Sequence, residues 1–128
     1  MPHLDVHALE SDLAGHETAL IQHLTDAVVA VYGEWARTIT VVRLTGLPPN
    51  RWGIGGTPAQ APSPSVTFGI KEAVFSRPDA DEIVARLVSG VTDAIVDVFG
   101  ERVRAGLMVE FVGAPAGRTG IGGVVVTP

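Results

Sequence analysis

The chain has 128 residues, of which 46 % are apolar and 18 % charged, and its formal net charge is −5. This length suits one domain or two small fused units, and the apolar content favours a folded core over a disordered chain. The sequence has no basic cluster for nucleic acid, no cysteine for a disulfide or thiolate metal site, and no apolar run of the roughly 18 residues that a membrane span needs. Its first residues lack the pattern of a signal peptide, so a cytoplasmic protein is expected.

The first half of the chain predicts a strand, a helix and a second strand. Residues 2–9 form a short, mainly apolar run that is typical of a strand. Between residues 20 and 31, apolar side chains recur at steps of three and four, which predicts one buried face of a helix. Gly33 is placed to end this helix, and the β-branched, apolar residues 39–44 predict the next strand.

The second half predicts the same order of elements. Residues 66–75 are expected to form a strand, and residues 107–112 the closing strand. Pro78 suits the start of a helix, and the acidic residues that follow it favour the first turn. Apolar residues from 83 to 99 then form the stripe that such a helix would bury.

An internal repeat links the two halves. The segment 24–34, LTDAVVAVYGE, returns at 91–101 as VTDAIVDVFGE, a shift of 67 residues. The same shift places the turn WGIGG at 52–56 on TGIGG at 119–123. The chain is therefore predicted to be a single domain of two pseudo-repeats, residues 1–56 and 66–123. A Pro- and Ser-rich linker over residues 57–65 would join them.

The repeat predicts an α+β fold. A strand–helix–strand unit crosses over right-handedly and makes its two strands parallel. Two such units around a pseudo-twofold axis give a four-stranded mixed sheet with both helices on one face. The other face of the sheet would be uncovered, so we expect the chain to form an oligomer. The apolar run 124–126 supports this, because an exposed apolar edge calls for a partner.

Pro2 is the candidate for chemistry. If Met1 is removed after synthesis, the ring nitrogen of Pro2 becomes a secondary amine. An apolar pocket would disfavour its protonated form, and an amine poised near neutrality can take a proton from carbon and return it elsewhere. The alternative interpretation is that this proline only fixes the backbone angle φ.

Pro2 at the start of a strand, with the turn at residues 52–56 at matching spacing, resembles the tautomerase superfamily, and above all 4-oxalocrotonate tautomerase. The duplicated chain is similar to fused members such as malonate semialdehyde decarboxylase and cis-3-chloroacrylic acid dehalogenase. The resemblance covers nearly the whole chain. It implies a tautomerase without metal or cofactor, acting on a small carboxylate-bearing keto or enol acid, and a homotrimer.

The resemblance also implies roles for single residues. Pro2 would be the general acid or base, and Trp52 would form an apolar wall beside it. Arg77, just before the second helix, would hold the substrate carboxylate, a task that suits the planar guanidinium fork. His3, next to Pro2, would line the pocket.

A second arginine is less clearly placed. The arginine that 4-oxalocrotonate tautomerase carries early in its second strand falls near Thr40 here. Arg43, Arg104 or Arg118 could take its role, and Arg118 is counted among the predicted substrate-binding residues.

The sequence also departs from the resemblance. The first unit carries acidic and serine side chains at residues 10–12, where an arginine would be expected, and the second begins near Ser65 without a terminal proline. One chain would then supply one base, and a trimer three sites. Asp79 stands where the decarboxylase has a second arginine. The water-activating acid of the dehalogenases has no clear counterpart, and Glu110 is the nearest candidate.

Two alternatives to the tautomerase therefore stay open. Protonated Pro2 could act as an acid in hydration, dehalogenation or decarboxylation. If Met1 is retained, the nitrogen of Pro2 is an amide and the protein would be a non-catalytic trimer. A metal site at His3, Asp5 and His7, which share one strand face, is the weakest interpretation.

Overall fold

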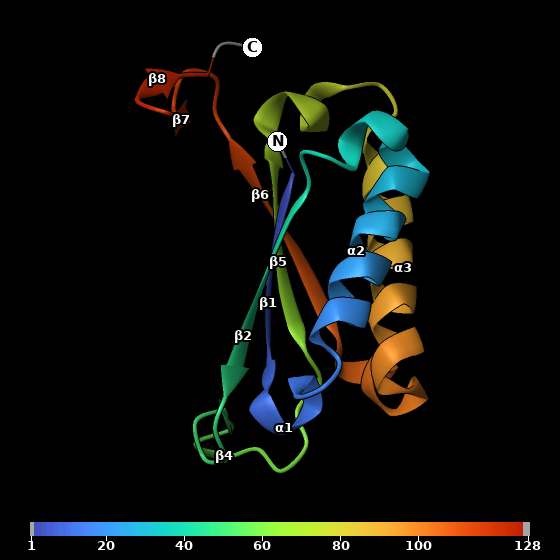
Figure 1. Cartoon of the computed structure of the whole chain (residues 1–128), viewed down its shortest axis with the longest axis vertical. Coiled ribbons are helices and arrows are strands. Elements are labelled where there is room, and N and C mark those ends of the chain that lie inside the picture. Colours follow the sequence, from blue (N-terminus) through green and yellow to red (C-terminus); the bar gives the residue numbers. More distant parts are fainter. Residues whose placement is uncertain (1, 127–128) are drawn as a thin grey trace.

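A computed structural model describes residues 2–126, and its centre is a mixed sheet of four strands in the order β2-β1-β5-β6. β1 is parallel to β2, β5 is parallel to β6, and β1 and β5 meet antiparallel at the centre. This arrangement confirms the predicted α+β fold with two β-α-β units (Figure 1). The strands are β1 His3–Leu9, β2 Val41–Leu47, β5 Ser65–Lys71 and β6 Met108–Ala114.

Two long helices cover one face of the sheet (Figure 1). Both end where a glycine adopts a positive φ, 109° at Gly33 and 98° at Gly100, which suits a residue without a side chain. Within the described residues, no helix has the length and apolar character that crossing a membrane requires. The long helices are α2 Glu17–Tyr32 and α3 Ala80–Phe99, and the short ones are α1 Glu10–Leu13, η1 Glu34–Ala36, η2 Glu72–Ser76 and η3 Glu101–Gly106.

Two small hairpins complete the fold, one after each parallel strand pair. They are β3 Gly53–Ile54 with β4 Thr57–Pro58, and β7 Gly120–Ile121 with β8 Val124–Val125. The segment predicted as a linker, 57–65, therefore begins with a hairpin strand, because Thr57 pairs with Ile54. The strand predicted over residues 66–75 ends at Lys71, where the chain turns into η2.

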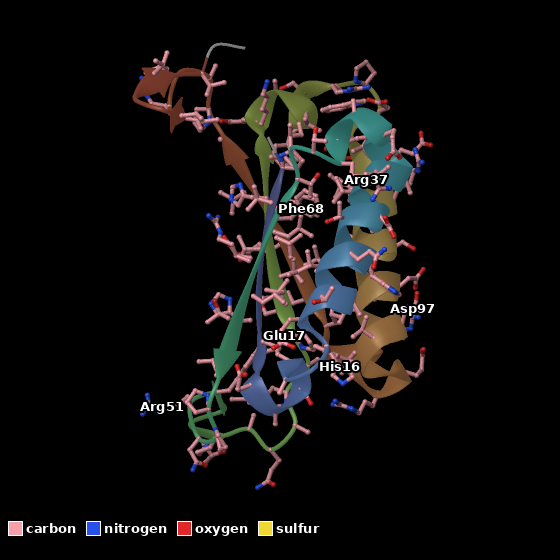
Figure 2. All side chains as sticks on the ribbon, in the orientation of Figure 1. His16, Glu17, Arg37, Arg51, Phe68 and Asp97 are labelled. Atoms are coloured by element: carbon pink, nitrogen blue, oxygen red, sulfur yellow. The ribbon has the colours of Figure 1, made fainter. Side chains whose placement is uncertain are left out.

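The core lies between the sheet and the two helices. Alternate residues of β1, Leu4, Val6 and Ala8, are buried against the helices. Phe68 of β5 is fully buried and stacks on Phe111 of β6, with ring centroids 5.1 Å apart. Figure 2 shows Phe68 in the layer that joins the sheet to the helices.

The sheet face away from the helices is open in the single chain. It carries a mixture of polar and apolar side chains, including the ion pair between Arg43 Nε and Asp5 Oδ1 at 2.6 Å. The guanidinium of Arg43 lowers the pKa of the Asp5 carboxyl. Met108 and Val112 of β6 expose 54 % and 51 % of their surface here, although both are apolar.

The repeat seen in the sequence also appears in the side-chain contacts. In each unit one arginine binds the carboxylates eleven and three residues before it. The arginines are Arg37 and Arg104, and the N–O distances are 2.7 and 2.6 Å in the first unit and 2.9 and 2.6 Å in the second (Figure 2 labels Arg37). The carboxylates are those of Asp26 and Glu34 in the first unit and Asp93 and Glu101 in the second.

Candidate active site

Pro2 is buried immediately before β1, at the end of the sheet where η2 and the β7–β8 hairpin also lie (Figure 1). Its carbonyl oxygen accepts a hydrogen bond from the Val41 N–H at 3.1 Å. This bond fixes the position of Pro2 against β2 and does not use the ring nitrogen. If Met1 is removed, the nitrogen would therefore be held in a defined place without belonging to the sheet.

A cavity of about 140 Å³ opens beside the start of β1. The end of β5 and the loop from β6 to the β7–β8 hairpin form its other walls. Most of its lining is apolar or backbone, and its polar side chains are those of His3, Lys71 and Thr119. The full lining is His3, Gly69, Ile70, Lys71, Ala73, Ala114, Pro115, Ala116, Gly117, Thr119, Ile121 and Val126.

His3 reaches this cavity because its neighbour in the sheet is a glycine. His3 lies directly opposite Gly69 in the antiparallel register of β1 and β5. A side chain at Gly69 would collide with the His3 imidazole, so only glycine lets the ring lie across β5. The structure therefore places His3 in the cavity, one residue after Pro2.

Arg77 lies at the same end of the molecule, between η2 and α3, but outside the described cavity lining. Its guanidinium already holds a carboxylate: Nε and Nη2 donate to the two Asp79 oxygens at 3.0 and 3.1 Å. This hydrogen-bonded pair raises the pKa of Arg77 and lowers that of Asp79. A substrate carboxylate would have to compete with Asp79 for Arg77.

Tyr32, in the last turn of α2, is a residue near Arg77 that the sequence did not single out. Its hydroxyl is buried and has no hydrogen-bond partner among the described residues. Burial raises the pKa of Tyr32, and the positive charge of Arg77 opposes that shift. An aromatic residue in the apolar stripe of a helix gives no sequence signal beyond packing, which is why it was missed.

Trp52 and Pro2 lie at opposite ends of the sheet within one chain. β1 and β2 run parallel in register from His3 with Val41 to Leu9 with Leu47, and Trp52 follows the far end of β2. Seven strand residues span about 20 Å, so the structure does not bring Trp52 to Pro2 of the same chain. Figure 2 shows neighbouring Arg51 at that far end, beside the first hairpin.

The hairpin that does lie near Pro2 is the second one, β7–β8. Because the central strands are antiparallel, each unit's glycine-rich turn lies at the start of the other unit's first strand. Thr119, the repeat counterpart of Trp52, therefore lines the cavity. An aromatic wall made by Trp52 would have to come from a neighbouring chain.

The three alternative arginines have different surroundings. Arg43 pairs with Asp5 on the open sheet face, and Arg104 belongs to the duplicated ion-pair cluster at the C-terminal end of α3. Arg118 is in the loop that forms one wall of the cavity, and its Nη1 donates to the Gly117 carbonyl at 3.0 Å. Of the three, the structure places Arg118 at the Pro2 end.

The structure also reveals a counterpart of Pro2 inside the chain. Pro64 stands immediately before β5, is fully buried, and accepts a hydrogen bond on its carbonyl from the Met108 N–H at 3.4 Å. Pro2 makes the equivalent bond to Val41, the repeat counterpart of Met108. The nitrogen of Pro64 is an amide, so the second unit has the proline without the amine.

A metal site finds no support in the described residues, which contain no group of three or more His, Cys, Asp or Glu side chains able to hold an ion. His3, Asp5 and His7 do share the open face, but the Asp5 carboxylate is bound to Arg43.

No family model and no curated protein matches the chain, whereas many solved structures do. A structure of F6 fused 4-OT, described as a wild-type asymmetric trimer, has a TM-score of 0.81 at 24 % identity, covering 96 % of this chain and 94 % of that one. Pt0534 inactivated by 2-oxo-3-pentynoate gives 0.79 at 18 % identity with the same coverage. Native RhCC from Rhodococcus jostii RHA1 gives 0.71 at 15 % identity, covering 98 % of this chain and 86 % of that one.

The fused 4-OT proteins are members of the tautomerase superfamily. At these identities the likeness concerns the fold, and it extends over both units. The chain therefore has the fold of the fused 4-OT-like tautomerases, and the resemblance predicted from its sequence is confirmed at that level.

Proposed function

We propose that the protein is a cofactor-independent tautomerase that uses Pro2, after removal of Met1, as general acid and base on small 2-keto or enol carboxylates. The observation that carries this proposal is the burial of Pro2 one residue before His3, which lines a largely apolar cavity, on a fold shared with 4-OT-like proteins. Burial supports the chemistry because it disfavours the protonated amine.

In the proposed reaction the ring nitrogen of Pro2 takes the proton of the enol hydroxyl. The electron pair left on oxygen becomes the new carbonyl, and the double bond shifts along the carbon chain. The proton on Pro2 then moves to the carbon at the end of the shifted system, which restores the amine. Arg77 and Arg118 are candidates to hold the carboxylate, and Trp52 of a neighbouring chain would exclude water.

Intact-mass measurement of the purified protein tests the first requirement. A mass lacking one methionine leaves a free secondary amine at Pro2, as the proposal needs. A full-length mass would rule out the Pro2 mechanism, because the nitrogen would then be an amide. Ketonisation of phenylenolpyruvate or 2-hydroxymuconate then tests the activity itself.

A non-catalytic protein of the same fold is the second candidate, and Pro64 is the observation that favours it. A buried proline whose nitrogen is an amide holds the equivalent place in the second unit. A proline at this place can therefore serve packing alone, without any catalytic role. A processed N-terminus without activity on any small enol acid would support this candidate.

We further propose that the protein works as a homotrimer through the open face of its sheet. The F6 fused 4-OT neighbour is described as a trimer, and here Met108 and Val112 expose apolar surface on the open face. Burying these two apolar side chains against a neighbouring chain would remove them from water.

Replacing Met108 with lysine should convert the oligomer to monomer, because burying an unpaired ammonium in the interface costs several kcal/mol. Size-exclusion chromatography with light scattering measures the change. Ile21→Lys is the matched control: Ile21 is 41 % exposed on α2, in the helical layer, and its change should leave the oligomer intact. A Met108→Lys protein that keeps the wild-type mass in solution would contradict the proposed interface.

A further inference from the structure

Lys71 is the only lysine of the chain, and it lies at the last position of β5. It lines the cavity beside His3, and its side chain is exposed in the single chain. Among the described residues it makes neither an ion pair nor a side-chain hydrogen bond. Its ammonium group is therefore available to a ligand in this cavity.

No carboxylate side chain is present in the described cavity lining. Lys71 consequently gives the cavity a positive charge that no lining group neutralises, and the rest of the wall is mainly apolar. This combination suits a small molecule with a carboxylate at one end and an apolar remainder. A neutral ligand would gain nothing from Lys71, and a cation would be repelled.

The neighbouring cations are less available for this task. The guanidinium fork of Arg77 is occupied by both oxygens of Asp79, and Arg77 is not in the described lining. Arg118 lies in the loop whose neighbouring residues line the cavity, but its Nη1 donates a hydrogen bond to the Gly117 carbonyl. Of these three cationic residues, Lys71 is the one that belongs to the described cavity lining.

We infer that Lys71 binds the substrate carboxylate in the cavity that is lined by His3, the residue after Pro2. This inference rests on the proposed function for the identity of the substrate, but the binding step itself does not need the amine of Pro2. Lys71 thus determines specificity for carboxylates, with Arg77 or Arg118 in support.

The sole lysine permits a direct test of binding. Protein labelled with ¹³C at lysine Cε should give a single lysine resonance, and titration with 2-oxopentanoate should move it in a saturable way. Pentan-2-one, which has the same carbon chain without the carboxylate, should not move it. No saturable shift with 2-oxopentanoate, or equal shifts with both compounds, would overturn the inference.

Variants test the same point by calorimetry. Lys71→Met should raise the Kd for 2-oxopentanoate roughly tenfold, the loss of one partly exposed charge-assisted hydrogen bond, and Lys71→Arg should restore it to within about threefold of wild type. Arg86→Met is the matched control, because Arg86 lies on α3 and donates to the Ala30 carbonyl, away from the cavity. An unchanged Kd in Lys71→Met would overturn the inference.

Steady-state kinetics separates this inference from the proposed function. If the wild type ketonises enol acids, Lys71→Met should raise KM about tenfold and change kcat by less than about threefold. A wild type that binds 2-oxopentanoate through Lys71 but lacks activity would refute the tautomerase and leave the carboxylate site intact. An active enzyme with unchanged KM in Lys71→Met would refute the role of Lys71 alone.

Discussion

Replacing Pro2 with alanine should lower kcat for ketonisation about a hundredfold, the lower end of what a positioned acid–base group contributes. The loss should not be complete, because alanine at the N-terminus still carries a primary amine. That amine lacks the ring, so it is held less firmly, and its affinity for a proton differs. Stopped-flow or spectrophotometric assays on phenylenolpyruvate measure the effect.

Pro64→Ala is the matched control for this substitution. Pro64 shares the burial and the carbonyl hydrogen bond of Pro2, but its nitrogen is an amide. If Pro2 acts through its amine, Pro64→Ala should cost stability and leave kcat nearly unchanged. Equal losses of activity in the two variants would show that the prolines serve packing, which contradicts the catalytic role of Pro2.

A covalent probe addresses the amine without reference to turnover. If Pro2 carries a free amine, as proposed, that amine should add to an electrophilic keto acid such as 2-oxo-3-pentynoate, the compound with which Pt0534 was inactivated. Peptide mass spectrometry should find one added molecule on the N-terminal peptide. A chain extended by one residue ahead of Pro2 should escape labelling, since its proline nitrogen is an amide. Labelling at Lys71 instead of Pro2 would count against the mechanism.

The sequence alone predicted the fold because its strongest signal was long and uninterrupted. One shift of 67 residues relates Asp26 to Asp93 and Arg37 to Arg104, and the structure shows each arginine paired with its aspartate in equivalent clusters, one in each unit. A strand–helix–strand unit almost always makes its two strands parallel with a right-handed crossover, so two such units allow few topologies. The boundaries were less exact: β5 ends at Lys71, since the chain turns into η2 there.

The repeat shift hid the counterpart of Pro2. At a shift of 67, Pro2 falls on Gly69, whereas the start of β5 at Ser65 corresponds to the start of β1 at His3, a shift of 62. Of these five residues of difference, four lie in α3, which has 20 residues where α2 has 16. The fifth lies in the segment between strand and helix, residues 72–79 in the second unit and 10–16 in the first. Pro64 could be recognised only once the strand starts were known.

The candidate site was predicted only in part, because it depends on which ends of the strands meet. The antiparallel pairing of β1 with β5 brings the second hairpin, with Thr119, to Pro2 and leaves Trp52 at the other end. No local pattern in the sequence encodes that pairing. Lys71 was missed for a similar reason, since a single lysine at a strand end normally faces water.

Replacing Phe68 with alanine should have the largest effect on stability. Phe68 is fully buried and stacks on Phe111 at 5.1 Å, in the layer between the sheet and the helices (Figure 2). Removing the ring takes away its burial and leaves a cavity, which typically costs about 3–5 kcal/mol of the free energy of unfolding. Urea denaturation followed by circular dichroism measures this, at one protein concentration because unfolding of an oligomer depends on concentration.

Two further variants separate the cavity effect from a general loss of aromatic surface. Phe68→Leu keeps most of the volume and should cost roughly 1–2 kcal/mol. Phe75→Ala removes a ring that is 38 % exposed in η2, so it should cost less than Phe68→Ala. Similar losses for Phe68→Ala and Phe75→Ala would mean that the layer around Phe68 can close over the missing ring. In that case the stack of Phe68 on Phe111, which lies within the second unit, would add little to the stability of the core.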